Sequence, residues 1–536
     1  MTTKKQNTHV ADSCNHEEHK QWNRRSFLQA LGIVGGGTMA LANSALSVAK
    51  PSPLAAAINT ADNDRILVLI RLKGGNDGLN TIVPLYDYDT YSNARPTLRI
   101  KENELFKFND DFGMAKYANK LERMWGDGMM KVVHGVGYEN SSLSHFKGSD
   151  IWATTDPKSE NEEGWMGRYF EQIFPDYLTN PPKKPTAIQI GNAGNLIFDT
   201  ADSNYAFAVA DPKKLYQIAR NGELYDMTKI PDCTHGEKIS YIKGVANATF
   251  AYAGVINDAF DKSSDFGNYS KDKLGQQLSI IARLIKGNLG TKVYMVELGG
   301  FDTHNDQLNR HETLITTLSE TIANFYNDLK DAGWDDKVLS MTISEFGRRV
   351  EENGSAGTDH GTASQTMLFG SGLDGNGFIG KHPDLSDLNK NGNLKPNTDF
   401  RSMYATVLKE WLCVDPKLID TALLGANYDI LSLGFSCNKT LGSNTDFIST
   451  DIFEHKVTYI DRQTYLNINL QNTMHVDIRL FNMLGQKVAT LQNKILTGGK
   501  HVINVKSKVG LRLDEGQYIY KIKIGQRVFS KPLMIL

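Results

Sequence analysis

Acidic and histidine side chains able to bind a metal ion occur in a short loop near the middle of the chain. The apolar run Val293–Val296 is followed by two glycines, and Asp302 and His304 come next in ELGGFDTH, Glu297–His304. Because side chains alternate along an extended segment, residues two positions apart lie on the same side. Carboxylate oxygens and neutral imidazole nitrogens both bind divalent cations. This spacing predicts that the loop contributes to a metal site.

Three further loops carry the same residue types near apolar runs. They place Asp77 in Gly74–Gly78 after Ile66–Leu72, Glu345 after Val338–Ile343, and Asp359 with His360 in Gly354–Gly361. Ligands of open α/β sheets bind beyond the carboxyl ends of the strands, so we expect the loops to meet. The predicted metal ligands are Asp77, Asp302, His304, Glu345, Asp359 and His360, around one or two ions of zinc, manganese, magnesium or calcium.

Each predicted ligand also has an ordinary alternative. An Asp in a Gly-rich turn most often serves the turn itself, and a single His is most often a surface or core residue. Glu345 can complete a metal shell, or it can orient His304 or His360 from outside the shell. Gly357 and Gly361 are expected to permit the backbone that turns the adjacent acid and histidine the same way.

A fifth loop carries candidates for other chemistry. Residues Gly137–Asp150 follow the predicted strand Lys131–Val136, are rich in hydroxyl groups and include Ser144 and His145. His145 can serve as a ligand, a proton donor or a packed neighbour. Arg348, close to one of the predicted carboxylates, has a guanidinium fork suited to an anionic substrate.

Strands that alternate with helices are needed to position these loops. The remaining predicted strand is Pro185–Ile190, and apolar residues recur at helical spacing before and after the central strand, at Leu278, Ile281, Leu284 and Ile285 and at Leu314, Leu318, Ile322, Phe325 and Leu329. This order predicts a mostly parallel sheet covered by helices. Residues 200–275 are expected to form a helical insertion, 371–399 a rim loop and 400–412 a terminal helix.

Length and composition indicate more than one domain and an ordinary globular chemistry. The chain has 536 residues and a net charge of −2, which gives no reason to expect a nucleic-acid partner. A Ser-, Asn- and Thr-rich stretch at 436–455 is predicted to link a main domain, 62–435, to a β-rich domain, 456–536. Cys413 and Cys437 can pair in an oxidising compartment, although a buried thiol is the expectation for Cys413.

The N-terminal 57 residues have the pattern of an export signal. A polar leader precedes Arg24-Arg25, and a weakly apolar, Gly-rich segment follows, as in a twin-arginine signal. A membrane anchor is the alternative, but the glycines and polar residues make this segment a poor bilayer span. No later segment is long and apolar enough to cross a membrane, so we expect an exported protein without a transmembrane anchor after processing.

The last ~80 residues alternate with the period of β-strands, which predicts a small sandwich. The stretches DIRLFNMLGQKVATL and DEGQYIYKIKIGQRVFSKPLMIL resemble the C-terminal sorting domain of the type IX secretion system. The resemblance implies export and type IX secretion machinery as partners, with a cell-surface or extracellular destination. An ordinary carbohydrate-binding or spacer sandwich is the alternative.

The main domain also resembles a known family. LIRLKGGNDGLNTIVP, SHF, GWMGR, GGFDTH, SEFGRR and GTDHGTA are similar in order and type to domain-of-unknown-function family 1501, over about residues 65–435. The resemblance implies an alkaline phosphatase-like α/β/α sandwich with a two-metal hydrolase centre, in which Asp77, Asp302, His304, Asp359 and His360 bind metal. It also makes Ser144 the candidate nucleophile, because the related superfamily places one in the loop after the second strand. Ser141 and Ser142 compete for that role, and Ser144 can equally serve only its own loop.

The leading hypothesis is an exported, metal-dependent hydrolase of phosphate or sulfate esters carried by a small molecule or polysaccharide. A formylglycine sulfatase is disfavoured because no Cys or Ser occurs in the C/S-x-P-x-R context that it requires. The alternative is a non-catalytic cell-surface binding or structural protein that retains the hydrolase fold and one ion. A third hypothesis is a carbohydrate hydrolase that uses Asp302 and Glu345 as its two carboxylates.

Overall fold

A computed structural model describes the main domain and the β-rich tail, which form two compact units, Asn63–Ser436 and Cys437–Leu536. The predicted leader and twin-arginine signal lie outside the described residues, as does most of the predicted linker. The described residues are 64–158, 160–175, 177, 181–191, 194–201, 203–220, 225, 234–265, 268–425, 428–435, 437, 448–449, 453–460, 463–470, 473–482, 487–506, 513, 515–524 and 527–535.

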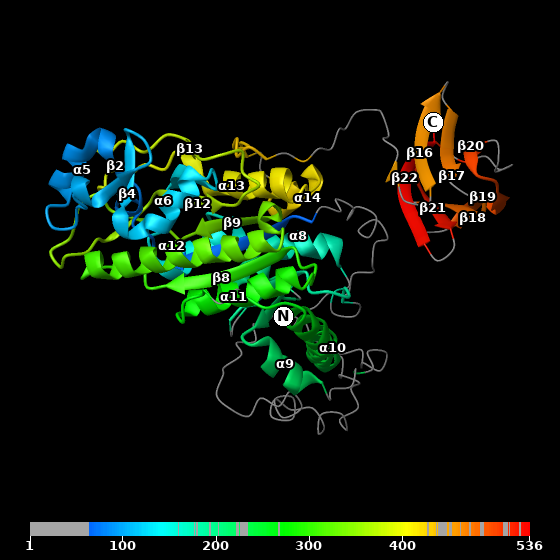
Figure 1. Ribbon diagram of the computed structural model, residues 1–536, viewed down its shortest axis with the longest axis horizontal. Helices are drawn as coiled ribbons and strands as arrows, with labels where there is room; N and C mark the ends of the chain where they lie inside the picture. Colours follow the sequence, from blue (N-terminus) through cyan, green and yellow to red (C-terminus); the bar gives the residue numbers. More distant parts are fainter. Residues whose placement is uncertain are drawn as a thin grey trace, which may run out of the picture. The chain divides into compact units, whose positions relative to one another are not determined.

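Within the described part of the first unit, nine strands form the central sheet (Figure 1). The order is β13-β5-β12-β9-β1-β8-β6-β7, and β14 also pairs with β5. The strands are β1 (Ile66–Lys73), β5 (Met130–Gly137), β6 (Ala187–Ile190), β7 (Ala206–Val209), β8 (Val293–Gly299), β9 (Val338–Ile343), β12 (Ser364–Phe369), β13 (Gly377–Ile379) and β14 (Thr398–Asp399). The five strands from β9 to β7 are parallel, which confirms the predicted mostly parallel sheet.

The sequence pattern did not predict the antiparallel strand β12. This strand brings an extra loop to the edge of the sheet where β1, β5, β8 and β9 end, which we call the functional edge. It pairs antiparallel with both β5 and β9, so its first residues lie at the edge where those strands end. The loop that enters β12 carries Asp359 and His360. The loops that leave β1, β5, β8 and β9 reach the same edge because these four strands run in one direction. One edge therefore gathers all five predicted loops.

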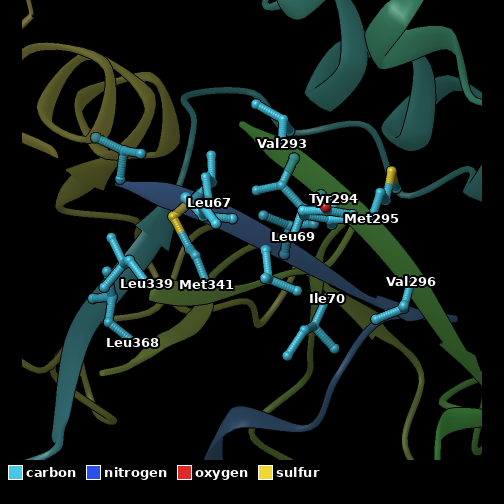
Figure 2. Packing of buried hydrophobic residues seen from close by; sticks show 14 of the residues in the cluster. Leu67, Leu69, Ile70, Val293, Tyr294, Met295, Val296, Leu339, Met341 and Leu368 are labelled. Atoms are coloured by element: carbon cyan, nitrogen blue, oxygen red, sulfur yellow. The ribbon is translucent and has the colours of Figure 1, made fainter. Parts of the chain in front are cut away.

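Helices cover the sheet and complete its core. They are α5 (Tyr88–Ala94), α6 (Asn119–Gly126), α7 (His145–Thr154), α8 (Trp165–Ile173), α9 (Pro212–Ala219), α10 (Thr234–Asp261), α11 (Lys273–Lys286), α12 (Gln307–Asp331), α13 (Phe400–Thr406) and α14 (Pro416–Ala422), together with the one-turn α4 (Gly78–Thr81). Every residue from Ile66 to Ile70 is buried, so both faces of the sheet are covered. Figure 2 shows this centre, where Leu69, Met295 and Met341 of neighbouring strands pack together.

Smaller elements differ from the sequence-based expectation in detail. The predicted terminal helix, 400–412, consists of α13 followed by the π-helix η6 (Val407–Trp411). The predicted rim loop, 371–399, includes the strands β13 and β14. A separate sheet has the order β2-β4-β3, and β10 pairs with β11. Their bounds are β2 (Val83–Pro84), β3 (Leu105–Lys107), β4 (Phe112–Ala115), β10 (Gly347–Arg348) and β11 (His360–Gly361), and the 3-10 turns are η1 (Leu85–Asp87), η2 (Glu102–Glu104), η3 (Lys116–Ala118), η4 (Leu196–Phe198) and η5 (Asp335–Lys337).

The second unit contains two antiparallel sheets, as predicted for the tail. One has the order β15-β16-β17-β20 and the other β19-β18-β21-β22. The strands are β15 (Ile448–Ser449), β16 (Phe453–Ile460), β17 (Gln463–Leu470), β18 (Met474–Phe481), β19 (Lys487–Leu496), β20 (Gly499–Asn504), β21 (Gly516–Ile524) and β22 (Arg527–Ile535). Alternate residues of both sheets, such as Leu466 and Ile478, share one core, which makes this unit a sandwich.

Cys413 differs from the sequence-based expectation of a buried thiol. Both Cys413 and Cys437 are disulfide-bonded, and Cys413 is only half-buried. Its backbone has a φ of 59°, an unusual value for a residue with a side chain.

Among the described residues, no helix has the length and apolar character needed to cross a bilayer.

Two histidines, His134 of β5 and His382, are buried among aromatic rings. His134 is 1% exposed, stacks on Phe378 and contacts Phe112, and neither of its ring nitrogens has a hydrogen-bond partner. Burial lowers the pKa of His134 to about 3, and the neighbouring His382 adds to this effect. An unfolded chain binds a proton at this residue below about pH 6.5, whereas the folded chain does not.

We therefore expect acid to destabilise the protein through His134. Its contribution is fully present above the unfolded pKa and declines as the pH falls below it, by about 2 kcal/mol between pH 7 and pH 5. His134→Phe should remove that part of the pH dependence in urea unfolding curves at the two pH values, and His475→Phe, at an exposed position, should not. An unchanged pH dependence in His134→Phe would contradict this assignment.

Candidate metal centre

Three imidazole rings converge on the carboxylate of Asp302 at the functional edge. The Nε2 atoms of His304 and His360 lie 3.1 and 3.2 Å from its Oδ1, and Nε2 of His145 lies 3.3 Å from its Oδ2. The two Nε2 atoms of His304 and His360 are 2.9 Å apart. His145, Asp302 and His360 each offer a ligand atom within 4.8 Å of the others, as a single bound cation requires. We call these four residues the His/Asp cluster.

The opposite nitrogen of each ring is held by a group that can only accept a hydrogen bond. Nδ1 of His360 lies 2.7 Å from the Leu143 carbonyl oxygen, Nδ1 of His304 lies 3.3 Å from Asp359, and Nδ1 of His145 lies 3.1 Å from Glu345. These acceptors place the ring proton on Nδ1, so in each neutral ring Nε2 carries a lone pair.

The donor set therefore fits a divalent cation. The Nε2 atoms of the neutral His304 and His360 rings are 2.9 Å apart, so their lone pairs face one another and the ionised Asp302. A cation between these atoms would stabilise this arrangement. Metal-bound histidines in proteins characteristically donate their other ring N–H to a carboxylate or a backbone carbonyl, as all three rings do here. Asp359 thus acts on the site through His304 rather than as a direct neighbour of Asp302.

Asp302 stays ionised because the buried guanidinium of Arg348 bonds to it. Burial opposes its ionisation, but the hydrogen bond from Arg348 and the contact with His360 outweigh burial and lower the pKa to about 2. The Arg348 side chain, which is 0% exposed, lies 2.8 Å from Oδ1 of Asp302. Its other N–H groups donate to the carbonyl oxygens of Gly74, Gly75, Phe301 and Thr358.

Arg348 consequently has a different place from the one expected of a substrate-binding residue. All of its guanidinium nitrogens bond to backbone oxygens or to Asp302, and the side chain has no contact with solvent. It joins the loops after β1, β8 and β9 and fixes the carboxylate at the centre of the cluster.

Asp77 lies apart from the His/Asp cluster, in a buried polar network. Its carboxylate forms an ion pair with Arg95 at 2.7 Å, and the two side chains are 1% and 0% exposed. It also accepts hydrogen bonds from Gln307 and from the backbone N–H groups of Leu79 and Asn80, capping α4. Burial opposes ionisation, but Arg95 lowers the pKa of Asp77. These contacts hold the carboxylate of Asp77 among protein groups.

Glu345 and Ser144 both adjoin His145, the first through a hydrogen bond and the second as its neighbour in the chain. Oε1 of Glu345 accepts hydrogen bonds from Gly74 N–H and from His145, so Glu345 orients His145 rather than the two histidines considered from the sequence. Oε2 of Glu345 is buried without a partner. Ser144 is exposed, precedes the first residue of α7 and makes no capping hydrogen bond with its side chain. Ser144 therefore directly precedes His145 in the chain and lies at the end of α7 where the first N–H groups of the helix are unsatisfied.

The glycines around Asp359 and His360 serve close packing, not an unusual backbone. A Cβ atom on Gly357 would lie 2.2 Å from the carbonyl carbon of His304, and one on Gly361 would lie 2.4 Å from that of Arg348. Neither glycine has a left-handed φ. Gly354, in the same loop, has open space around it.

We expect Gly357→Ala to weaken metal binding by displacing His304. Changes in the groups that orient metal ligands typically cost about 10–100-fold in affinity. Gly354→Ala is the matched control and should bind metal as the wild type does. Titration of both variants with zinc, followed by calorimetry, measures the effect, and equal affinities would show that the close contact does not position His304.

Sequence reasoning identified all five loops but not every partner in them. The sequence left the role of His145 open between a ligand, a proton donor and a packed neighbour. The structure places its Nε2 atom 3.3 Å from Oδ2 of Asp302. Arg95 and Gln307, the partners of Asp77, lie at the end of α5 and at the start of α12, outside the predicted loops. No local spacing marks such residues, because their role depends on how distant segments fold together.

The fold and the cluster together define a mixed α/β protein with an imidazole and carboxylate cluster at the carboxyl edge of its sheet. Residues 256–427 match the family described as "Protein of unknown function (DUF1501)", and residues 462–536 match the "Secretion system C-terminal sorting domain". The sorting domain marks the chain for secretion to the cell surface or the extracellular space. No curated protein matches the chain.

Solved structures similar to this chain include members of the alkaline phosphatase and sulfatase group. One is a protein of the alkaline phosphatase superfamily from Vibrio parahaemolyticus, with 10% identity, 85% and 84% of the two chains covered and a TM-score of 0.28. Another is the PsFucS1 sulfatase from Pseudoalteromonas sp., with 9% identity, 83% and 84% covered and a TM-score of 0.28. A third is the lipoteichoic acid synthase LtaP from Listeria monocytogenes, with 9% identity, 59% and 70% covered and a TM-score of 0.27. Such distant likenesses carry no functional weight.

Proposed function

We propose that the protein is an exported, metal-dependent hydrolase of phosphate or sulfate esters. The observation that carries this proposal is the convergence of His145, His304 and His360 on Asp302, with every Nδ1 held by an acceptor. The secretion sorting domain supports the exported state. A set of three imidazoles and one carboxylate suits zinc or manganese better than calcium or magnesium, which prefer all-oxygen ligands.

The cluster lies beside a second feature that suits an anionic substrate. Ser144 and the start of α7 adjoin His145, and the first N–H groups of a helix attract phosphate and sulfate oxygens. A divalent cation bound by the cluster would supply Lewis-acid stabilisation of the negative charge that develops on the ester. The helix end would orient the ester group, and Arg348 would hold Asp302 in its ionised state.

Ser144 is the proposed nucleophile. Its Oγ would form a bond to phosphorus or sulfur while the bond to the alcohol oxygen breaks, and the serine proton would pass through solvent to the departing alcohol. Water would then attack the covalent ester, release phosphate or sulfate and return the proton to Ser144. The exposed position of Ser144 at the helix start supports this role.

We expect Ser144→Ala to lower turnover of aryl phosphate or aryl sulfate at least about 100-fold while metal content is retained. Ser142→Ala, two residues away, is the control and should keep most of the activity, although its hydroxyl accepts a hydrogen bond from Ser144 N–H. Metal analysis and aryl ester assays of the same preparations test both statements. Full turnover in Ser144→Ala would assign the attack to another group.

A further inference from the structure

A cavity of about 200 Å³ lies along α7. Glu345 connects it to the His/Asp cluster, because it lines the cavity and its Oε1 accepts a hydrogen bond from His145. The cavity, which we call the α7 cavity, is lined by Arg71, Ser149, Asp150, Trp152, Ala153, Gly194, Asn195, Leu196, Ile197, Ile343, Ser344 and Glu345. None of the four residues of the His/Asp cluster lines it.

Two buried polar side chains of this cavity have an atom without a hydrogen-bond partner. Glu345 is 3% exposed and its Oε2 is unpartnered, and Trp152 is 8% exposed and its Nε1 is unpartnered. A buried polar atom without a partner typically costs about 1–3 kcal/mol, so a ligand that supplied the missing hydrogen bonds would be stabilised here. Both occur in residues that line one cavity, one as an acceptor and the other as a donor. This combination indicates a ligand that both donates and accepts hydrogen bonds.

The charges of the cavity favour hydroxyl groups over a further anion. Asp150 and Glu345 contribute two carboxylates, whereas the guanidinium of Arg71 already donates to Ser149 at 2.7 Å and lies 3.5 Å from Glu297. An anionic group would face two carboxylates and only one engaged cation. Hydroxyl groups, in contrast, can donate to the carboxylates and accept from the indole N–H.

The size and position of the cavity fit a single ring attached to the ester. A cavity of ~150 Å³ is enough for a benzene ring, so about 200 Å³ holds one substituted ring. Along α7, His145 and Ser149 are separated by a rise of roughly 6 Å, which places the cavity one ring away from the cluster.

We propose that the α7 cavity binds one polyhydroxylated ring of the alcohol that carries the ester, so that the substrate is an ester of a saccharide. This inference rests on the proposed hydrolase function and names the substrate class of the same site. Oε2 of Glu345 and the carboxylate of Asp150 accept hydroxyl hydrogens, and Nε1 of Trp152 donates to a ring or hydroxyl oxygen.

Binding of neutral sugars to the full-length protein tests the inference without turnover. The probes are methyl glycosides of the common hexoses, with ethanolamine as a cationic probe and inorganic phosphate as an anionic one, measured by calorimetry and saturation-transfer NMR. Trp152→Phe keeps the ring that stacks on Phe400 but removes the N–H, and Asp150→Asn removes a charge. Each should weaken glycoside binding roughly 5- to 10-fold, whereas the control Trp125→Phe should not change it. Thermal melts serve as the folding check for all three variants.

The outcomes separate this inference from the proposed function. Glycoside binding that weakens in both variants supports the cavity even where aryl esters are not hydrolysed, in which case the hydrolase proposal alone fails. Turnover of aryl esters without binding of any methyl glycoside overturns the inference and leaves the hydrolase intact. Preferential binding of ethanolamine, or glycoside affinities equal to wild type in both variants, also overturns it.

Discussion

Asp302→Asn is expected to lose bound metal and, with it, hydrolytic turnover. The side chain keeps its shape but no longer carries the negative charge on which three imidazoles and Arg348 converge. Loss of a carboxylate ligand should reduce metal affinity by more than the 10–100-fold typical of changes in outer groups. Metal analysis after desalting, together with aryl phosphate and aryl sulfate assays, measures both effects.

The same loop provides a matched control for this variant. Asp306 is exposed, has a left-handed backbone with a φ of 45°, and accepts a hydrogen bond from Asn309 outside the cluster. Asn adopts that conformation readily, so Asp306→Asn should retain fold, metal and turnover. Because Asp302 also bonds Arg348, thermal melts of both variants are needed. Normal metal content in a folded Asp302→Asn protein would exclude this carboxylate as a ligand.

Arg95→Met is expected to give the largest loss of stability among single substitutions in the first unit that we consider. It would leave the carboxylate of Asp77 buried without its cation, and breaking a buried ion pair in this way costs about 3–5 kcal/mol. The same substitution also leaves the carbonyl oxygens of Arg349 and Val350 without their donor. Urea unfolding of the full chain measures the change in the free energy of unfolding.

Two further variants show whether the ion pair causes this loss. Arg123, which has an 83% exposed side chain, provides the control Arg123→Met, and this change should alter stability by less than about 0.5 kcal/mol. Adding Asp77→Asn to Arg95→Met removes the unpaired charge and should recover part of the loss. Because the carboxylate of Asp77 bonds to protein groups, we expect the Asp77→Asn protein to retain the metal ion bound by the His/Asp cluster. A double variant no more stable than Arg95→Met would contradict the ion-pair explanation.

The strand-end loops were predictable because each combines a β-branched run with glycines and a metal-binding side chain. Asp302 and His304 follow this pattern and do meet His360, whose loop enters β12 from the same edge. Asp77 follows the same pattern but bonds Arg95 instead. Local sequence describes the end of a strand, but it does not show which distant cation will fold beneath that end.

The helices and the tail were predictable for a related reason. The apolar stripe from Leu314 to Leu329 has the period of α12, and the alternation at Tyr465–Leu470 has the period of β17. Strand β12 was not predicted, because its sequence SQTMLF lacks a run of β-branched residues. Its antiparallel pairing with β5 and β9 nonetheless decides where Asp359 and His360 lie. The site therefore depends on strand pairing between distant segments, which the local sequence pattern does not predict.

Direct observation of the metal environment tests the central claim. The full-length protein is loaded with zinc, desalted and studied by X-ray absorption spectroscopy. The His/Asp cluster predicts three imidazole nitrogens and one carboxylate oxygen around the ion at ~2.0–2.2 Å. A protein that retains no zinc, or an ion surrounded by oxygen atoms without imidazole scattering, would contradict the assignment of His145, His304, His360 and Asp302 as a metal centre.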